Sequence, residues 1–463
     1  MAIVRFGSNG WRARFDDGFD RQAVLRIASA LGSLLSVRYE GETVLVGYDT
    51  RRGAEHMAIA AGEALAAWGM RVVVSNQSCP TPSLAWQVAH DYSCVAGFML
   101  TACEAPCEYG GIVLCGEDGG PTTEAFTDLV ERQISARLSV GRGPIERADF
   151  ITNHVESLVW GTDAGLIGSR RPRVVVDTLY GTGGGIVSDL LQRVGCEVIA
   201  IHQERVSDFR GLHPNACEPW VDDCERTVVE NHADLGLVFD GDCSRLALVD
   251  ESGKLVSQHD LAPLALEHLV GQRGGHGRVV ISLASSVRTI MQAERLGCPY
   301  DMVPVGAEAL HREFAEGDVL LAADERGGLC VPGHLHKRDA LLVALMVLEL
   351  LAGTEEGALE HVRQLEAQVG SMEYGARDIR LDFAAMQRLR NLLPGIYPAD
   401  ICGMQPTSVS HANGLRLGFE DRSWLMVRPS RHRQIAHCVA EAPSTAQRDK
   451  LLSEAARLAR EIA

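Results

Sequence analysis

The sequence lacks the features of a membrane protein and those of a secreted one. No apolar run approaches the roughly 20 residues that a membrane span needs. Residues 1–7 also lack the basic segment and the long apolar core of a signal peptide. We therefore expect a cytoplasmic protein with no membrane partner.

Positive charge is scarce as well. The chain has 44 Lys and Arg residues against 61 Asp and Glu residues, which gives a formal net charge of −17 at pH 7. Nucleic acids and anionic membranes both require a basic face on the protein that binds them. Nucleic acid is therefore excluded as a general partner, and an acidic protein that binds phosphate must concentrate its positive charge locally.

The cysteines do not have the pattern of a disulfide framework. There are 13 of them, which is an odd number, and they are scattered without any Cys-x-x-Cys spacing. In a reducing cytosol most of them should be free thiols that act as small apolar core residues. Only Cys103, Cys107 and Cys243 lie inside the motif segments described below.

What the chain does have is the composition of a large folded protein. Its 463 residues are 46% hydrophobic and 23% charged, which is typical of globular proteins. A chain of this length is too long for one ordinary hydrophobic core and is expected to form three or four domains.

Strand-like and helix-like patterns alternate along the first 370 residues. The apolar spacing over 24–35 predicts an amphipathic helix, the β-branched run 43–48 predicts a buried strand, and similar pairs recur over 173–201 and 278–351. After residue 370, two short strands at 415–419 and 423–427 flank a turn, which favours a different domain. We expect an α/β fold of three similar α/β domains with mixed or parallel sheets and a C-terminal α+β domain around a central cleft, over residues 1–148, 149–255, 256–370 and 371–463.

A glycine-rich turn at 181–185 follows one of the predicted strands. Such a turn can hold phosphate at the N-terminus of a helix, but no Lys-Ser or Lys-Thr pair follows it, as a P-loop would require. A tight structural turn is the favoured interpretation.

Three segments with polar and reactive side chains each follow a predicted strand. They read Thr-Ala-Cys-Glu-Ala-Pro at 101–106, Asp-Gly-Asp-Cys-Ser-Arg at 240–245 and Asp-Glu-Arg-Gly-Gly at 324–328. Ligands of open α/β sheets bind beyond the carboxyl ends of the strands, so these loops can face one cleft. A fourth segment, Arg-Pro-Ser-Arg-His-Arg, lies at 428–433 in the C-terminal region.

The order and spacing of these four segments resemble the α-D-phosphohexomutases, the phosphomannomutase/phosphoglucomutase family. The resemblance covers nearly the whole chain. It implies a protein of carbohydrate metabolism whose ligand is a phosphorylated hexose, whose activity is that of an isomerase that transfers a phosphoryl group within the sugar, and whose cofactor is Mg²⁺.

By this resemblance Cys103 occupies the position of the serine that carries the phosphoryl group. A thiolate is a strong nucleophile when its pKa is lowered, but the neighbouring carboxylate of Glu104 acts in the opposite direction. Val113 stands where the resemblance implies a lysine for proton transfer, and Glu308 replaces another lysine. Among the catalytic candidates, Arg12 is also expected to hold phosphate and Arg245 to meet an anion.

The second loop is expected to hold a metal ion. The resemblance implies three aspartates there, of which Asp240 and Asp242 are present and Ser244 replaces the third. Because Mg²⁺ prefers hard oxygen ligands, we predict a weakened Mg²⁺ site. Zn²⁺ held with the help of Cys103 or Cys243 is an alternative. Because no Cys-x-x-Cys pair supports a zinc site, cysteines that only fill space are the favoured interpretation.

The third and fourth loops are expected to bind the sugar and its second phosphate. In the third, Asp324 and Glu325 would accept hydrogen bonds from sugar hydroxyls, while Arg326 adds bulk and charge where the resemblance implies a serine. In the fourth, positive charge is concentrated, and arginines bind phosphates well. A solvated basic turn is equally consistent with that composition; the candidate ligands are Arg428, Ser430, Arg431 and His432.

Three functional hypotheses follow. The leading one is a phosphohexomutase-fold protein that binds phosphorylated hexoses with its mutase chemistry weakened or lost, acting as a sensor or as a regulatory partner of an active relative. The alternative is an active intramolecular phosphotransferase that uses Cys103 and an altered substrate or metal. The third is a scaffold or homo-oligomer without a ligand.

Overall fold

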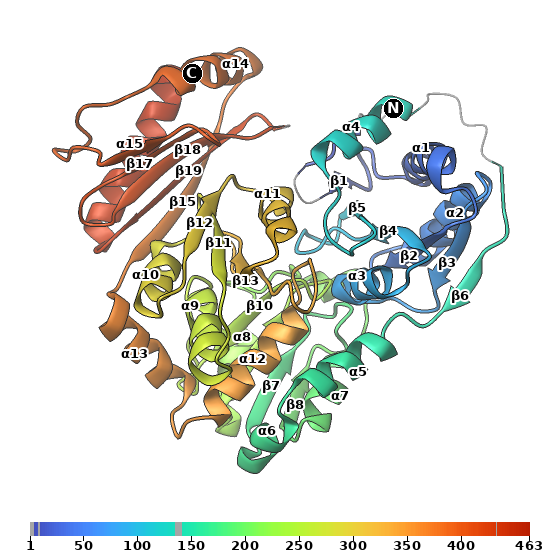
Figure 1. Ribbon diagram of the computed structural model, residues 1–463, viewed down its shortest axis with the longest axis horizontal. Helices are drawn as coiled ribbons and strands as arrows, with labels where there is room; N and C mark the ends of the chain where they lie inside the picture. The colour runs from blue at the N-terminus through green and yellow to red at the C-terminus, as the bar shows by residue number, and fades with distance from the viewer. Residues whose placement is uncertain (1–3, 8–9, 135–140, 432) are drawn as a thin grey trace.

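Four β-sheets with their covering helices surround a central region of the molecule (Figure 1). The computed structural model describes residues 4–7, 10–134, 141–431 and 433–463. Each sheet falls inside one of the four ranges expected from the sequence, and the expected fold class is confirmed. The exact domain boundaries stay a prediction. We refer to the four parts as domains I to IV.

Domain I contains a mixed sheet with the strand order β1-β5-β4-β2-β3-β6. Strands β2, β3, β4 and β6 run parallel, and β1 and β5 complete the sheet in antiparallel pairings. Helices α1 and α2 pack on one face and α3 on the other. The elements are β1 (Trp11–Arg14), α1 (Arg21–Tyr39), β2 (Thr43–Tyr48), α2 (Ala54–Ala66), β3 (Arg71–Ser75), α3 (Thr81–His90), β4 (Cys94–Leu100), β5 (Tyr109–Cys115), α4 (Glu124–Gln133) and β6 (Glu146–Ala148).

Domain II repeats this architecture with four strands in the order β10-β9-β7-β8. Side chains along β7 alternate between two cores, since Val174 and Val176 face the side of α7 whereas Val175 faces the side of α8. This alternation is the period of two that a strand buried on both faces requires. The elements are α5 (Thr152–Gly161), α6 (Ala164–Arg170), β7 (Arg173–Asp177), α7 (Ile186–Arg193), β8 (Glu197–Ile201), η1 (Phe209–Gly211), α8 (Asp222–Asn231), β9 (Leu235–Phe239) and β10 (Leu246–Val249).

Domain III has the strand order β12-β11-β13-β14. Its apolar helix α12 is buried against α6, α9 and β10, so it links the cores of domains II and III. Among the described helices none is long and apolar enough to cross a membrane. The elements are α9 (Leu261–Leu266), η2 (Glu267–Gln272), β11 (Arg278–Ser282), α10 (Val287–Arg295), β12 (Tyr300–Val303), α11 (Ala307–Arg312), η3 (Glu313–Glu316), β13 (Val319–Ala323), β14 (Leu329–Cys330), α12 (Ala340–Ala352) and α13 (Ala358–Val369).

Domain IV is an antiparallel sheet in the order β15-β19-β18-β17-β16, and the expected hairpin is β17–β18. Along β18, Leu425 and Val427 pack under α14 and α15, whereas Trp424 and Met426 pack against domain III. The elements are β15 (Glu373–Arg380), α14 (Phe383–Leu392), η4 (Leu393–Gly395), β16 (Ser408–Ser410), β17 (Leu415–Gly418), β18 (Trp424–Pro429), β19 (Ile435–Ala442) and α15 (Thr445–Ile462).

Glu441 on β19 joins domains III and IV. Its carboxylate is fully buried and accepts hydrogen bonds from the Val287 backbone N–H at 2.9 Å and the Trp424 indole N–H at 2.8 Å, and also from the Ser286 hydroxyl. Val287 begins α10, so this buried acid also compensates the positive end of that helix.

The glycine-rich turn at 181–185 allows a close backbone approach. A Cβ atom on Gly181 would lie 2.7 Å from the carbonyl oxygen of Gly241, and one on Gly183 would lie 2.8 Å from the sulfur of Cys243. The turn thus packs directly against the 240–245 loop, which accounts for its glycines in structural terms.

The thirteen cysteines are all free thiols, and ten of them are buried. This confirms the expectation drawn from their number and spacing.

Candidate active site

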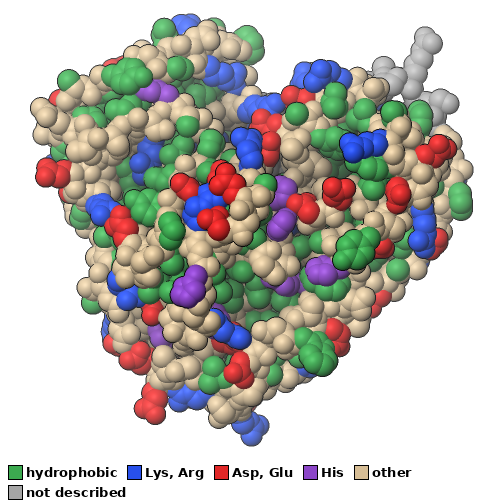
Figure 2. All heavy atoms as spheres, in the orientation of Figure 1, with side chains coloured by type: hydrophobic (Ala, Val, Ile, Leu, Met, Phe, Trp, Pro, Cys, Tyr) green, Lys and Arg blue, Asp and Glu red, His purple; other side chains and the backbone are tan. Residues whose placement is uncertain are grey.

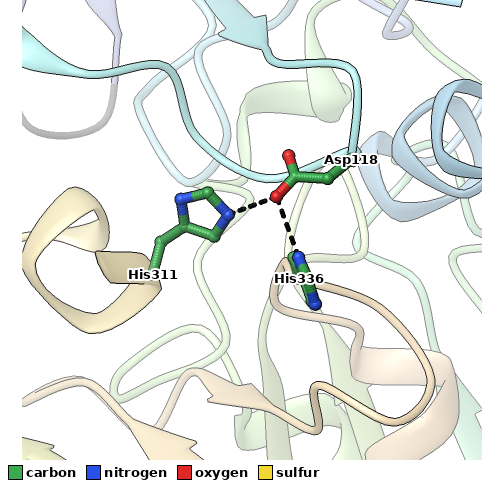
Figure 3. A group of neighbouring side chains, drawn as sticks. All are labelled: Asp118, His311 and His336. Atoms are coloured by element: carbon green, nitrogen blue, oxygen red, sulfur yellow. Dashed lines mark hydrogen bonds and ion pairs between the residues drawn. The ribbon is translucent and has the colours of Figure 1, made fainter. Parts of the chain in front are cut away.

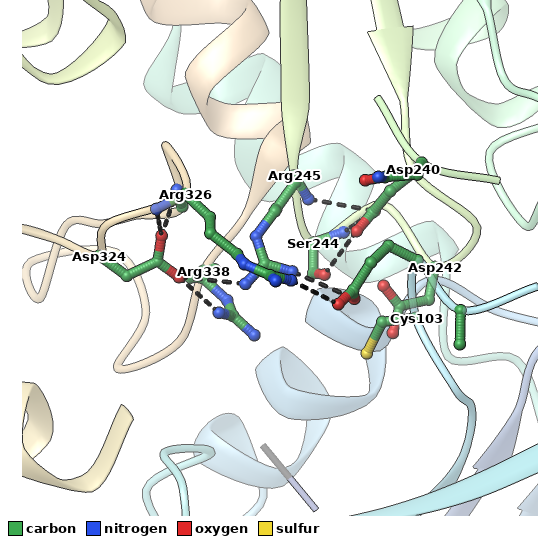
Figure 4. Close-up of polar contacts among 12 residues, drawn as sticks. Cys103, Asp240, Asp242, Ser244, Arg245, Asp324, Arg326 and Arg338 are labelled. Carbon is green, nitrogen blue, oxygen red and sulfur yellow. Dashed lines mark hydrogen bonds and ion pairs between the residues drawn. The ribbon is translucent and has the colours of Figure 1, made fainter. Parts of the chain in front are cut away.

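The first three motif loops line one pocket, as their positions after predicted strands suggested. They follow the carboxyl ends of β4, β9 and β13 in domains I, II and III. Cys103, Ser244, Asp324 and Glu325 all contribute to its wall, and Figure 4 shows the loops converging. We call this cavity the cleft pocket.

Arg51 fixes the backbone of the first loop. Its buried guanidinium donates to the carbonyl oxygens of Cys103 at 2.8 Å, Ala105 at 2.5 Å and Pro106 at 2.7 Å, and it is itself held by Asp49 at 3.0 Å. The Gly-Tyr-Asp-Thr-Arg segment at 47–51 therefore braces the loop. Cys103 adopts a positive φ of 49° within it, a conformation that a non-glycine residue rarely takes.

The thiol of Cys103 is poorly suited to act as an anion. Burial raises its pKa well above the usual value, the nearby Asp242 carboxylate raises it further, and Arg12 lowers it by less than these effects. The thiol is consequently protonated at neutral pH, and a protonated thiol is a weak nucleophile.

Glu104 is surrounded by three guanidinium groups. Its carboxylate accepts two hydrogen bonds from Arg12 at 3.0 and 3.2 Å, one from Arg245 at 3.3 Å and one from Arg326 at 3.0 Å. Burial alone would raise the pKa of Glu104, but Arg12 and Arg245 lower it well below its usual range. The site thus contains a permanent carboxylate anion inside an arginine cage, which consists of Arg12, Arg245 and Arg326.

Asp324 is also engaged by arginines. Its carboxylate accepts hydrogen bonds from Arg245 at 3.2 Å and Arg338 at 2.6 Å, and from the backbone N–H groups of Arg326 and Gly328 at 2.9 and 2.8 Å (Figure 4). The adjacent Glu325 accepts a hydrogen bond from Ser282 at 3.1 Å and lines the cleft pocket. Of the two acids predicted to recognise the sugar, Glu325 therefore accepts fewer hydrogen bonds from the protein and has more capacity for a ligand.

The 240–245 loop presents two buried carboxylates. Asp240 accepts from the backbone N–H and the hydroxyl of Ser244 at 2.8 and 3.1 Å, and Asp242 accepts from the hydroxyls of Thr81 and Thr101 at 2.6 and 3.0 Å. The second oxygen of Asp242 is buried without a hydrogen-bond partner among the described residues. Burial, followed by the charge of Asp242, raises the pKa of Asp240 to about 7.

Comparison with known proteins identifies the family of this chain. Family models of phosphoglucomutase/phosphomannomutase α/β/α domains I, II and III match residues 4–140, 152–253 and 258–369. The chain belongs to the phosphoglucomutase/phosphomannomutase family. The family resemblance inferred from the four loops is thereby confirmed.

Relatives cover almost the full length of the chain. A phosphoglucomutase/phosphomannomutase of Thermococcus kodakarensis is 26% identical over 447 residues, which span 95% of this chain and 94% of the relative. A crystal structure from Thermus thermophilus, provisionally described as a phosphomannomutase, is 27% identical with a TM-score of 0.86 and 99% coverage of both chains. An N-acetylphosphoglucosamine mutase of Aspergillus fumigatus, solved with GlcNAc-6P and magnesium, shares the fold at 13% identity, a TM-score of 0.57 and coverage of 100% of this chain and 96% of that one.

The residues that depart from the family pattern also lie at the pocket. Val113 and Glu308 both line it. Glu308 accepts a hydrogen bond from the backbone N–H of Glu124 at 2.7 Å. Its carboxylate therefore caps the first turn of α4, and the position lacks the positive charge that a lysine would supply.

Lys337 is a pocket residue that the sequence analysis did not single out. It lines the cleft pocket, and its ammonium group donates to the sulfur of Cys115 at 3.1 Å. The sequence contains only three lysines, Lys254, Lys337 and Lys450. Because lysine is so rare in this chain, the position of Lys337 just before the Arg338-Asp339 pair could have identified it as a candidate site residue.

Arg428 of the fourth loop has a guanidinium without a partner among the described residues. No hydrogen bond or ion pair among the residues that the structure describes involves the Arg428 side chain. Burial lowers the pKa of Arg428, and the Glu325 carboxylate opposes this effect. Arg428 therefore lies near Glu325 with its donors available for an anion.

The other residues of this loop have different surroundings. Ser430 accepts a hydrogen bond from the backbone N–H of Arg433 at 3.3 Å, and Arg431 forms ion pairs with Glu124 and, at 3.2 Å, with Asp128 on α4. Arg431 thus connects domain IV to domain I. Figure 2 shows a notch in the molecular surface with Lys and Arg side chains along its edges. His432 lies outside the described residues.

Cysteine ligation of a metal finds no support at the 240–245 loop. The groups of described side chains that could hold a metal ion contain neither Cys103 nor Cys243. The sulfur of Cys243 instead faces the hydroxyl of Thr182 at 3.7 Å. The interpretation of these cysteines as space-filling residues agrees with this arrangement.

Proposed function

We propose that this phosphohexomutase-family protein binds a phosphorylated hexose in its cleft and has weak or no mutase activity through residue 103. The observation that carries the proposal is the position of Glu104 inside the arginine cage. Guanidinium groups gathered around one point suit a phosphoryl group, and here a side-chain carboxylate of the protein takes that place.

Phosphoryl transfer needs a carrier that can lose and regain the phosphoryl group. Cys103 is buried, its pKa is raised, and the anionic carboxylate of Glu104 follows it directly. A phosphate dianion that approached the thiol would also approach this fixed negative charge. These surroundings disfavour the alternative in which Cys103 replaces the family's phosphoserine.

The substitutions at the other reactive positions also weaken proton transfer and metal binding. Val113 and Glu308 cannot act as the cationic lysines that the family pattern implies, and general acid–base catalysis typically contributes about 10²–10⁴-fold to a rate. The structural neighbour from Aspergillus fumigatus was solved with magnesium. The unpartnered oxygen of Asp242 fits a cation, so Asp240, Asp242 and Ser244 would hold Mg²⁺ here, less firmly than three aspartates. When bound, Mg²⁺ would neutralise phosphate charge.

The groups that hold a ligand are better preserved than the groups that react. Arg428 has donors available, Glu325 faces the cleft pocket, and Lys337 adds a positive charge to its wall. A structural neighbour binds GlcNAc-6P, which supports a phosphorylated hexose as the ligand class. Binding without efficient turnover suits a sensor, or a regulatory partner of an active family member.

The first test combines a binding assay with a mutase assay. Purified protein is titrated calorimetrically with glucose 1-phosphate, mannose 1-phosphate and glucosamine 1-phosphate, and turnover is followed with Mg²⁺ and a bisphosphate primer. We expect binding of at least one sugar phosphate and turnover at least about 10³-fold below that of an active relative assayed in parallel, because the proton-transfer contribution is missing.

A repaired variant provides the matched control. The combined substitutions Cys103→Ser, Glu104→His, Val113→Lys and Ser244→Asp restore the family pattern at the reactive positions and should raise turnover. Efficient turnover of the native protein that disappears in Cys103→Ala would contradict the proposal and favour the cysteine mechanism. Failure to bind any phosphorylated hexose would favour a scaffold.

A further inference from the structure

Three side chains from two domains meet beside the cleft pocket. Asp118 lies in the turn between β5 and α4 of domain I, His311 lies on α11, and His336 lies in the loop before α12 of domain III. Figure 3 shows both imidazole rings directed at the same carboxylate. No part of the proposed function uses this group, which we call the His₂Asp cluster.

The donor atoms have the arrangement of a ligand set. Nε2 of His311 lies 2.5 Å and Nδ1 of His336 lies 2.9 Å from the same oxygen of Asp118, and the three donor atoms all lie within 4.8 Å of one another. Zn²⁺ binds imidazole nitrogen and carboxylate oxygen at about 2.0–2.2 Å, so ligand atoms around one ion are roughly 3 Å apart. Small side-chain adjustments would therefore place one ion between these atoms.

The local backbone is shaped to hold these rings. The other oxygen of Asp118 accepts the backbone N–H of Gly120 at 2.9 Å, which fixes the orientation of the carboxylate. A Cβ atom on Gly120 would lie 2.4 Å from Nε2 of His311, so a larger residue there would displace the ring. Phe314 packs edge-on against His311, with ring centroids 5.6 Å apart, and lies 5.3 Å from His336.

The cluster is open to solvent. The side chains of His311, His336 and Asp118 are 22%, 32% and 38% exposed, and His336 lines the cleft pocket. An ion could therefore enter, and water or a ligand could complete its coordination. Two imidazoles and one carboxylate leave coordination positions free on a divalent ion.

A second group of two histidines and an aspartate shows what a structural cluster looks like in the same protein. His154, His334 and Asp339 are largely buried, His154 also bonds the hydroxyl of Ser83 at 3.0 Å, and Asp339 caps the first turn of α12. Its polar atoms serve the packing between domains, and none of the three residues lines the cleft pocket.

We propose that Asp118, His311 and His336 bind a divalent transition-metal ion, with Zn²⁺ as the best fit, and leave an open coordination position toward the cleft. Imidazole ligands favour Zn²⁺, Ni²⁺ or Co²⁺ over Mg²⁺, so this site is distinct in chemistry from the aspartate loop at 240–245. Because its ligands come from domains I and III, a bound ion also fixes these two domains to each other at the edge of the cleft.

The test uses the full-length protein after removal of metal by a chelator and no sugar phosphate. Zn²⁺ is titrated calorimetrically, and Co²⁺ is then bound as a spectroscopic probe. We expect one Zn²⁺ ion to bind per protein molecule with micromolar affinity or tighter. The Co²⁺ absorption spectrum should lack the intense sulfur-to-metal charge-transfer bands that thiolate ligation by any of the cysteines would give. His311→Ala, His336→Ala and Asp118→Asn should each weaken binding by at least about tenfold, which corresponds to 1.4 kcal/mol.

The exposed His276 provides the matched control, because His276→Ala removes an imidazole that is no part of the cluster and should leave the titration unchanged. Absence of binding, a thiolate spectrum, or equal affinity in the cluster variants and the control would overturn the proposal. If His311→Ala does not fold, the conservative variant Asp118→Asn and the Co²⁺ spectrum of the native protein test the proposal. Since no sugar phosphate is present, this result is independent of the proposed function.

Discussion

The guanidinium of Arg12 binds the carboxylate of Glu104 through two hydrogen bonds, of 3.0 and 3.2 Å. Such a bidentate pair is the geometry in which arginine also binds phosphate. Glu104 therefore occupies the anion site that a phosphoryl group would need, directly after the residue that the family pattern predicts as the phosphoryl carrier.

Substitution of Glu104 tests this occupancy. Glu104→Gln removes the negative charge while keeping the shape, so we expect the affinity for sugar phosphates to rise by about tenfold, or 1.4 kcal/mol. Inorganic phosphate should also raise the melting temperature of this variant more than that of the native protein, because Arg12 and Arg326 then lack their anion and Arg245 keeps only Asp324. Glu108→Gln, at a half-exposed acid four residues away, is the control, and equal affinity in all three proteins would contradict the prediction.

Removal of Arg428 tests the second anion position. Since its guanidinium has no partner among the described residues and lies near Glu325, Arg428→Met should lower sugar-phosphate affinity by about 10–100-fold while leaving the fold intact. A charge-assisted hydrogen bond contributes about 1.5–3 kcal/mol. Calorimetry measures the affinity, and Arg377→Met, at an exposed arginine of the same domain, should have no effect.

Arg431 makes the cleft width testable. Its ion pairs with Glu124 and Asp128 join domain IV to α4 of domain I. Exposed pairs contribute only about 0–1 kcal/mol, so Arg431→Ala should barely change the melting temperature but should increase the radius of gyration measured by small-angle scattering. Arg433→Ala in the same loop is the comparison; an identical scattering curve for Arg431→Ala would show that the pairs do not hold the domains.

His259 should make the protein less stable in acid. Burial, assisted by Arg288, lowers its pKa from 6.5 to about 4, and its ring lies 3.9 Å from that of Tyr374. Because the folded state disfavours protonation, this contribution to stability is complete above the unfolded pKa of 6.5 and is lost as the pH falls toward 4. The loss amounts to about 1–3 kcal/mol.

The variant His259→Phe keeps a ring beside Tyr374 and removes the titration. Differential scanning calorimetry at about pH 7.5 and about pH 4.5, on either side of the unfolded pKa, should show a smaller fall in apparent melting temperature for the variant than for the native protein. Parallel falls in the two proteins would mean that other groups account for the acid sensitivity.

The elements of the fold were predictable because their signals are local. The apolar spacing over 24–35, the β-branched run at 43–48 and the short strands at 415–427 each carry their own pattern, and the structure has α1, β2 and the β17–β18 hairpin there. The positions of the three motif loops at strand ends also sufficed to place them around one pocket.

The partners of the site residues could not be predicted in this way. Contacts such as that between Glu104 and Arg326, 222 residues apart, depend on how domains I and III are arranged, which no local pattern specifies. The His₂Asp cluster had one visible trace, the His334-x-His336 spacing. Even so, the two histidines of that pair belong to different clusters, since His334 bonds Asp339 whereas His336 bonds Asp118.

The buried contact of Glu441 has a consequence for how the molecule can deform. Any rotation of domain IV alone would draw this carboxylate away from Ser286 and Val287 and would disrupt the apolar contact that Trp424 and Met426 make with domain III. Opening of the cleft by domain IV alone therefore requires exposure of a buried carboxylate and loss of an apolar contact, so Glu441 and its neighbours set the free-energy cost of that motion.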